Sequence, residues 1–182
     1  MSVRIRRAGA GDIDFLLELA THDDVEPYMS VARPRDRESL LAEVERSLAE
    51  PRERGRFVVE VDEDGAWKRA GTMAFEVANR RSRIASLGGL AIHPDYRGRR
   101  LADAAARLLQ RHLLLELGYH RLQLECYGFN ERAIRHAERA GFVREGVRRK
   151  AYWRHGRWVD GIMFGLLRDD IEAGAETANT SD

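Results

Sequence analysis

The feature that most constrains the fold is a strand–turn–helix segment that is followed directly by another strand. Residues 84–93 read as a strand that stops at Pro94. Residues 101–117 repeat apolar side chains at helical spacing, and Gly118 follows as a typical C-cap. Residues 121–126 then alternate as a strand. Such units place helices against a sheet with parallel strands, so the chain is predicted to have an α/β (or α+β) fold, with a mixed sheet and helices on both faces.

The remaining segments complete this architecture. Asp12 is a plausible N-cap for a first helix, and a second helix over residues 36–49 carries an apolar stripe. We predict a single domain over residues 1–170 with about six to seven strands, and a small polar tail at residues 171–182 that we expect to be disordered. The expected stripe consists of Leu40, Leu41, Val44 and Leu48; the other expected strands cover residues 3–7, 57–61, 70–78, 143–153 and 159–167, and a short helix covers residues 131–140.

Composition narrows the function. The 31 basic and 30 acidic residues nearly cancel, whereas a nucleic-acid-binding protein usually carries a large positive excess. Cys126 is the only cysteine, which excludes an intrachain disulfide and a thiolate metal cluster, and no histidines have metal-ligand spacing. No apolar run approaches the roughly 20 residues that span a bilayer, and the first residues do not resemble a signal peptide. We therefore expect a cytoplasmic protein that binds no metal, nucleic acid or membrane.

Residues 90–102 are the best candidate for a ligand site. They lead from the strand through a turn rich in glycine and arginine into the helix. Backbone N–H groups at a helix N-terminus point outward, and the helix dipole favours negative charge there. Neighbouring arginines add charge-assisted contacts to phosphate oxygens. The alternative is a turn that binds nothing, because many strand-to-helix turns contain glycine.

This turn resembles the diphosphate-binding motif of the GNAT family of N-acetyltransferases. That motif reads Gln/Arg-x-x-Gly-x-Gly/Ala after a lead-in that ends in Tyr-Arg-Gly. Arg97 and Ala102 occupy its first and last places, and Arg100 replaces its middle glycine. Glycine there lets the backbone approach the phosphate closely, so Arg100 either compensates by pairing with phosphate or weakens the site.

Residues 124–142 resemble a second block of the same family, with Glu125, Asn130 and the run from Glu138 to Phe142 in matching places. The likeness is closest to the branch that contains the ribosomal-protein alanine acetyltransferases and the spermidine acetyltransferases. It implies a GNAT fold in which a splayed strand pair holds acetyl-CoA as cosubstrate. The cofactor-binding residues implied are Leu90, Ala91, Ile92, Arg97, Gly98, Arg99, Arg100, Leu101, Ala102 and Asn130.

The resemblance also implies catalytic roles. Glu125 matches the family's catalytic base, with a surface carboxylate as the alternative reading and Glu76 or water in reserve. Ala137 stands where the family usually has a tyrosine as general acid. Tyr127, Tyr152 or solvent is left to protonate the leaving thiolate, and we assign this role to Tyr127. Asn130 also suits an N-cap, and alternation places Cys126 on the face opposite Glu125 as a buried structural thiol.

The resemblance implies that the acceptor is a primary amine, and the pKa of that amine discriminates between classes of acceptor. Holding a lysine-like amine neutral at pH 7.4 costs roughly 4 kcal/mol, against well under 1 for an α-amine, so a peptide or protein N-terminus is favoured. The alternatives are a small amine, for which Asp23, Asp24 and Glu26 offer acidic groups, and a non-catalytic CoA-binding module. Family members are often homodimers. Trp153 and Trp158 are expected in the core or in the wall of the acceptor pocket.

Overall fold

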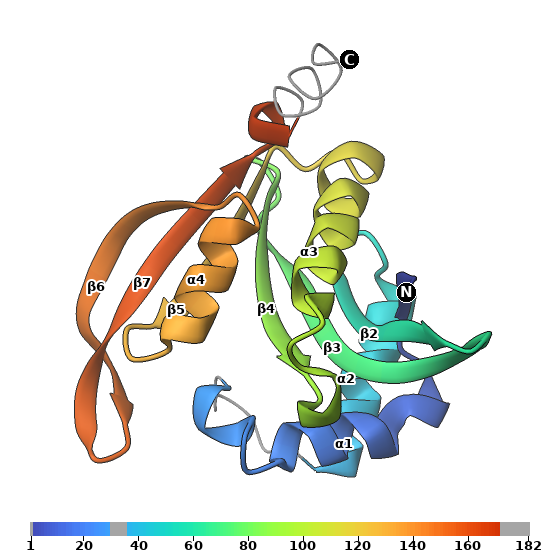
Figure 1. Ribbon diagram of the computed structural model, residues 1–182. Helices are drawn as coiled ribbons and strands as arrows, with labels where there is room; N and C mark the ends of the chain where they lie inside the picture. The colour runs from blue at the N-terminus through green and yellow to red at the C-terminus, as the bar shows by residue number, and fades with distance from the viewer. Residues whose placement is uncertain (1, 30–35, 172–182) are drawn as a thin grey trace, which may run out of the picture. The chain divides into compact units, whose positions relative to one another are not determined.

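The structure is a computed structural model that describes residues 2–29 and 36–171. Seven strands form one sheet in the order β1-β2-β3-β4-β5-β7-β6 (Figure 1). β4 and β5 pair in parallel, whereas β5 pairs with β7, and β7 with β6, in antiparallel fashion. The predicted mixed α/β sheet is therefore confirmed.

The chain divides into two compact units, Met1–Glu76 with Leu87–Leu109, and Val77–Ser86 with Gln110–Asp182. Three elements cross between them: β3 (Ala66–Asn79), β4 (Ile84–Ile92) and α3 (Leu101–Arg111). The first unit otherwise contains β1 (Val3–Arg7), η1 (Ala10–Asp12), α1 (Ile13–Thr21), η2 (Glu26–Tyr28), α2 (Arg37–Ala49), β2 (Arg54–Glu63) and η3 (Pro94–Tyr96). The second contains η4 (His112–Glu116), β5 (Arg121–Tyr127), α4 (Glu131–Arg139), β6 (Val143–Arg154) and β7 (Arg157–Leu167).

In the first unit the helices cover both faces of the sheet. Val58 of β2 packs in a cluster with α1 and α2 on one face. Val61, three residues along β2, packs with Leu101 at the start of α3 on the other face. Side chains of a strand point alternately to its two faces, so one apolar strand contributes to both layers of core. This arrangement is visible in Figure 1, where α3 lies on one side of the strands and α1 and α2 lie on the other.

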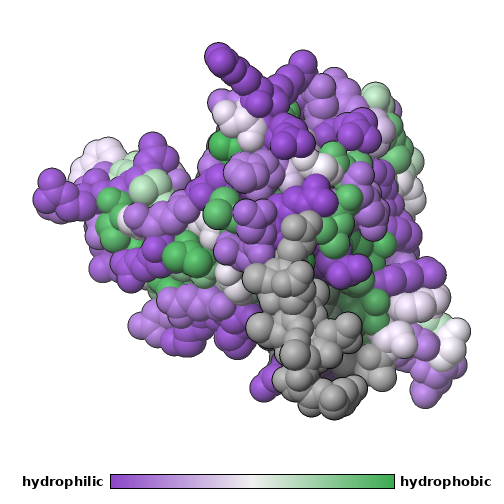
Figure 2. All heavy atoms as spheres, turned by 90° about the horizontal axis from the view of Figure 1, so that it is seen from above, coloured by the Kyte–Doolittle hydropathy of each residue, from purple (hydrophilic) through white to green (hydrophobic). Residues whose placement is uncertain are grey.

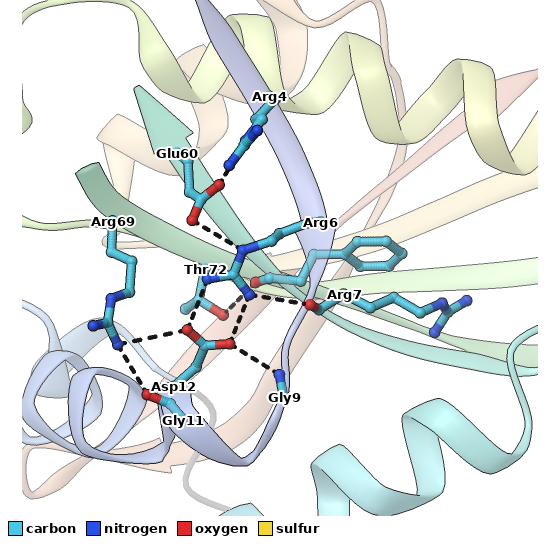
Figure 3. A network of polar contacts seen from close by, with 10 residues as sticks. Arg4, Arg6, Arg7, Gly9, Gly11, Asp12, Glu60, Arg69 and Thr72 are labelled. Atoms are coloured by element: carbon cyan, nitrogen blue, oxygen red, sulfur yellow. Dashed lines mark hydrogen bonds and ion pairs between the residues drawn. The ribbon is translucent and has the colours of Figure 1, made fainter. Parts of the chain in front are cut away.

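A network of charged side chains joins β1 to its neighbours (Figure 3). Arg6 donates to both carboxylate oxygens of Asp12, at 2.7 and 2.8 Å, and its Nε donates to Glu60 at 2.9 Å. Arg4 reaches the other oxygen of Glu60 at 2.7 Å, and Arg69 lies 3.5 Å from Asp12. Both carboxylates are buried, with side chains 7% and 6% exposed. The arginines thus stabilise two charges that burial alone would disfavour.

In the second unit, α4 covers one face of the strands (Figure 1). Residues Ile84–Ser86 of β4 pair with Arg121–Gln123 of β5, and β5 pairs along its length with β7. Phe164 and Leu166 of β7 are buried, as is Ala137 of α4. The buried side chain of Gln110 donates to the carbonyl of Ala140 at 2.9 Å, which satisfies one carbonyl at the end of α4.

Most predicted elements are confirmed to within a few residues, with three corrections. Asp12 does precede α1, but its carboxylate makes no cap hydrogen bond to that helix, because it accepts from Arg6 and from the Gly9 amide instead. Leu48 is exposed, so it does not belong to the buried stripe of α2; Ser47 is buried there. The helix predicted to reach residue 117 ends as an α-helix at Arg111 and continues as the π-helical turn η4. Of the tail predicted at residues 171–182, Ile171 is helical, and residues 172–182 lie outside the described residues.

Among the described residues, no helix is long and apolar enough to cross a membrane. The face shown in Figure 2 is mostly hydrophilic, and its hydrophobic residues form scattered patches.

The charge network generates a prediction about acid stability. Arg6 holds the pKa of Asp12 below its usual value, so the stabilisation is complete above the unfolded pKa of about 3.9 and is lost as pH falls through the folded value. We expect Asp12→Asn to lower the free energy of unfolding at pH 7 by about 2–3 kcal/mol, and the difference from wild type to shrink below about pH 4. Urea unfolding at pH 7 and pH 3 measures both. The control is Asp14→Asn, whose exposed side chain pairs with exposed Arg37 and should change stability by less than about 1 kcal/mol. Equal effects of the two variants at pH 7 would contradict this account.

Candidate functional site

The strand that carries Leu90, Ala91 and Ile92 is held at its end by close backbone packing. His93, the residue after β4, donates its N–H to the carbonyl of Ala70 at 2.8 Å. Gly71 lies so close to β4 that a Cβ atom there would be 2.5 Å from the Ala91 carbonyl oxygen. Only glycine allows this approach. Leu90 and Ile92 are partly buried and Ala91 is buried, so this end of β4 is packed into the first unit.

The turn from Arg97 to Ala102 joins η3 to α3. Gly98 has a φ of +79°, and a Cβ atom there would meet nothing within 4 Å, so the backbone at this point is open. Arg97 directs its side chain back into the first unit: Nε donates to the Ile92 carbonyl at 3.3 Å and Nη2 to the Asp24 carbonyl at 3.2 Å. Arg99 pairs with Glu63 at 2.6 Å. The side chains of Arg97 and Arg99 therefore hold the turn, and the N–H groups at the start of α3 stay the predicted contacts of a diphosphate.

Arg100 adopts the backbone conformation that glycine favours. Its φ is +56°, in the left-handed region, and its carbonyl accepts from the Ala104 amide at 3.2 Å, just before the first residue of α3. A residue with a Cβ atom is strained by about 1–2 kcal/mol in this region. Arg100, at the motif's glycine place, thus has a backbone conformation that glycine would adopt without strain, and its side chain is exposed.

Glu125 of β5 lies in a polar cluster with two residues of β6. Its Oε2 accepts from Arg148 Nη1 at 3.1 Å, and its side chain is 25% exposed. It also accepts a hydrogen bond from the Tyr152 hydroxyl. The pair with Glu125 raises the pKa of Arg148. Burial, followed by the hydrogen bond to Glu125, raises the pKa of Tyr152, so this phenol keeps its proton at neutral pH.

This cluster depends on a glycine in the strand between β5 and β6. β7 lies between those two strands, and Gly161 stands opposite Tyr127 on β5 and Arg148 on β6. A Cβ atom at Gly161 would overlap Oε1 of Glu125 and lie 2.8 Å from Cε2 of Tyr152. Glu125 therefore reaches across β7 only because residue 161 has no side chain.

Gly165 repeats this arrangement four residues along β7. Arg121 of β5 reaches Glu145 of β6 with both nitrogens, one at 2.6 Å, and a Cβ atom at Gly165 would lie 2.5 Å from the Arg121 guanidinium. Arg121 lowers the pKa of Glu145. Two ion pairs thus cross β7 on one face, each over a glycine, because residues four apart in a strand point the same way.

Tyr127, the assigned acid, lies beside the cluster. Its ring is stacked on Phe129 with centroids 5.4 Å apart and meets the Tyr152 ring edge-on at 5.3 Å. Arg154 lies 5.3 Å from the same ring. Glu125 and Tyr127 are two residues apart on β5, so both point to the face that carries the cluster.

The other assigned positions have clear local roles. Asn130 is the N-cap of α4, where its Oδ1 accepts from the Ala133 amide at 3.1 Å, and its link to the pantetheine stays a prediction. Ala137 is buried, so α4 supplies no hydroxyl at the family's tyrosine place. Burial, followed by the charge of Glu125, raises the pKa of Cys126 to about 11, which fits an unreactive thiol.

Two expectations concern the acceptor region, and the first of them needs correction. Trp153 and Trp158 face each other across the β6–β7 hairpin and are 59% and 58% exposed, so they are not core residues. Asp24, one of the three acidic groups offered for a polyamine, lies 3.4 Å from the Arg97 guanidinium, which partly compensates its charge.

Residues 2–143 match the Acetyltransferase (GNAT) domain family. The chain belongs to the GNAT family. The match covers more than three quarters of the 182 residues, and it includes the turn at Arg97 and the cap at Asn130.

Known proteins with the GNAT fold resemble this chain in sequence or structure. The SPbeta prophage-derived uncharacterized N-acetyltransferase YokL of Bacillus subtilis is 37% identical over 83 residues, 46% of this chain and 47% of that protein. The chain thus matches about half the length of this curated relative. The spermidine N-acetyltransferase of Vibrio cholerae in complex with CoA and spermine superposes with a TM-score of 0.79 at 21% identity, covering 92% of this chain and 96% of that one. The ribosomal-protein-S5-alanine acetyltransferase of Vibrio fischeri gives 0.79 at 18% identity over 93% and 95%. These two structural likenesses establish the fold.

The left-handed Arg100 generates a prediction. Glycine is ordinarily about 0.5–1 kcal/mol less favourable than alanine in a regular segment, but the Cβ strain at residue 100 reverses this order. We expect Arg100→Gly to be more stable than Arg100→Ala by about 1 kcal/mol in urea unfolding. The same pair of substitutions at Arg107, inside α3, should show the ordinary order. If alanine is the more stable substitution at both positions, the left-handed conformation is not present in solution.

Proposed function

We propose that this GNAT protein transfers the acetyl group of acetyl-CoA to the N-terminal amine of a peptide or protein by direct attack. The proposal rests on the family membership and on one observation: the carboxylate of Glu125, the candidate base, is paired with Arg148. A carboxylate whose charge is compensated attracts an ammonium ion weakly. An α-amine, with a pKa of about 7.7–8.0, supplies enough neutral amine at physiological pH without such attraction, whereas a polyamine does not.

Glu125 is the proposed acceptor of the proton that the amine loses. In the proposed step the neutral amine nitrogen attacks the thioester carbonyl carbon, the carbon–sulfur bond breaks, and the CoA thiolate leaves. The amine proton passes to Glu125, directly or through one water. Arg148 and Tyr152 hold the carboxylate in one orientation, and Tyr152 acts as a positioning residue because its proton is already shared with Glu125.

Tyr127 is the proposed donor of a proton to the leaving thiolate. It lies on the same face as Glu125, and its ring contacts the ring of Tyr152. Thiols have a pKa near 8.5, so much of the thiolate takes a proton from any nearby source at neutral pH. The absence of the family tyrosine at Ala137 is therefore expected to lower kcat little. For the same reason Tyr127→Phe should lower kcat only a few-fold.

Acetyl-CoA is the proposed cosubstrate, held through its diphosphate by the turn from Arg97 to Ala102, in which the Arg97 N–H itself donates to the Pro94 carbonyl at 3.1 Å. The open backbone at Gly98 and the position of this turn at the N-terminus of α3 support this assignment. The strand residues Leu90, Ala91 and Ile92 and the cap residue Asn130 remain the predicted contacts of the pantetheine. A homodimer remains the predicted assembly, which light scattering tests.

Acetylation of a small amine is the second candidate, since the spermidine enzyme of Vibrio cholerae shares the fold. Asp23 and Glu26, both exposed, are the acidic groups that would support it. Acceptor-dependent CoA release, followed with a thiol reagent, distinguishes spermidine and aminoglycosides from peptides with a free N-terminus. Acetyl-CoA binding without release on any acceptor would instead indicate a non-catalytic CoA-binding module.

Gly161 provides a test of the base that leaves Glu125 itself unchanged. A methyl group at residue 161 overlaps the flexible end of Glu125, so we expect Gly161→Ala to fold but to displace the carboxylate from Arg148 and Tyr152. The kcat for a peptide acceptor should fall at least tenfold, as a positioned base contributes about 10²–10⁴-fold. Glu125→Gln should lower kcat by a similar or larger factor.

Gly165→Ala is the matched control. Gly165 lies on the same strand and face as Gly161, but a methyl group there disturbs the Arg121–Glu145 pair instead of Glu125. It should leave kcat within about threefold of wild type while changing stability about as much as Gly161→Ala. Equal losses of kcat in both glycine variants would mean that the cross-strand contacts are only structural. Full activity in Glu125→Gln would remove Glu125 as the base.

A further inference from the structure

The β6–β7 hairpin carries a net positive charge larger than that of the whole chain. Residues 143–167 contain six Arg or Lys and two Asp or Glu, a net charge of +4, whereas the whole chain has +1. Both acidic residues are engaged: Glu145 pairs with Arg121, and Asp160 accepts from the Lys150 amide at 2.7 Å. Arg149, Lys150 and Arg157 are exposed. The hairpin therefore presents uncompensated positive charge.

The same hairpin presents exposed apolar surface. Among the described residues, eight large hydrophobic side chains are exposed, and four of them lie on this hairpin: Val143, Val147, Trp153 and Trp158. The two indole rings meet edge-on with centroids 5.2 Å apart, next to Arg154 and Arg157 in sequence. Exposed aromatic residues beside arginines are typical of surfaces that bind a partner.

The positively charged strand β6 borders the candidate acceptor site. Arg148 and Tyr152 belong to β6, and both contact Glu125. Between them the strand bulges: Arg148 stands opposite Gly161 and Tyr152 opposite Val159, and Lys150 has a φ of +51°. A bulge of this kind redirects the side chains of a strand. The cationic residues at 149 and 150 thus lie in the segment that joins two contacts of the candidate base.

We propose that the β6–β7 hairpin selects acceptor peptides whose residues after the N-terminal amine are acidic. This inference rests on the proposed function and names the acceptor class for it. Once the terminal amine is near Glu125, the following residues of a peptide extend past Arg148, where positive charge attracts carboxylates and repels arginine or lysine. Trp153 follows Tyr152 and Trp158 precedes Val159, so the two indoles point to the opposite face of the hairpin and take no part in this selection. The charge that favours an acidic peptide also disfavours a polyamine, which is cationic along its whole length.

Three peptides that differ only in charge test the selection. They share an N-terminal Ser-Gly and continue with three Asp, three Asn or three Arg residues, so that none contains a lysine amine. We expect kcat/KM at low salt to be about tenfold higher for the Asp peptide than for the Arg peptide, with the Asn peptide between them, and the ratio to fall toward one in 0.5 M NaCl. Spermidine is run in parallel.

The double variant Arg149→Glu/Arg157→Glu should abolish or reverse the ratio of the Asp to the Arg peptide. Arg80→Glu/Arg81→Glu, which makes the same charge change in the exposed turn between β3 and β4, should leave it unchanged. Thermal melting and acetyl-CoA titration check that each variant is folded and binds its cosubstrate.

Equal kcat/KM for all three peptides would overturn the charge selection while leaving N-terminal acetylation intact. Acetylation of spermidine but of no peptide would instead overturn the proposed function. If the hairpin variant weakens acetyl-CoA binding and slows all peptides alike, the hairpin cations bind the cosubstrate, and the selection is also wrong. Tight RNA binding that the hairpin variant abolishes, with no peptide preference, would assign the surface to a nucleic acid.

Discussion

The charge network centred on Arg6 is the interaction on which the first unit depends. It fixes Asp12, and through Asp12 it fixes the residue from which α1 begins. Where α1 ends, Leu19 and Val25 pack against Ala91 of β4, and Asp24 meets Arg97 of the turn. The position of the turn from Arg97 to Ala102 is thus linked, contact by contact, to a guanidinium on β1. Because buried charges tolerate only a well-paired geometry, this link is more specific than apolar packing alone.

In the second unit, side chains on two non-adjacent strands contact each other. β5 and β6 are separated by β7, and neighbouring strands are about 4.8 Å apart, so side chains on β5 and β6 must reach across roughly 10 Å. Long side chains can cover this distance only if the intervening strand has none at the crossing point. Gly161 and Gly165 meet that requirement, and the ion pairs above them differ in use: one holds the candidate base, and the other ties the strands.

Much of this could be predicted from the sequence, for identifiable reasons. The strand, turn and helix from residue 84 to residue 117 are encoded locally, by Pro94, Gly98 and the apolar spacing of the helix, and Asn130 signals its own cap. The role of Gly161 could not be predicted, because it depends on a strand order in which β7 lies between β5 and β6. The pairing of Glu125 with Arg148 depends on the same order. The sequence shows that Arg100 departs from the motif, but only the backbone angle shows that this residue adopts the left-handed conformation that glycine favours.

The glycine at residue 161 also has a consequence for how such a protein can change its acceptor. A new specificity would be sought among the exposed residues of the β6–β7 hairpin, which tolerate variation because few neighbours constrain them. Residue 161 lies within the same hairpin, on β7, and has no side chain to offer a substrate, yet we expect any larger residue there to uncouple β6 from Glu125. In a library that randomises every position near the acceptor, variants of residue 161 would therefore lose activity although this residue makes no contact with the substrate. The hairpin is free to diverge only while this one position stays without a side chain.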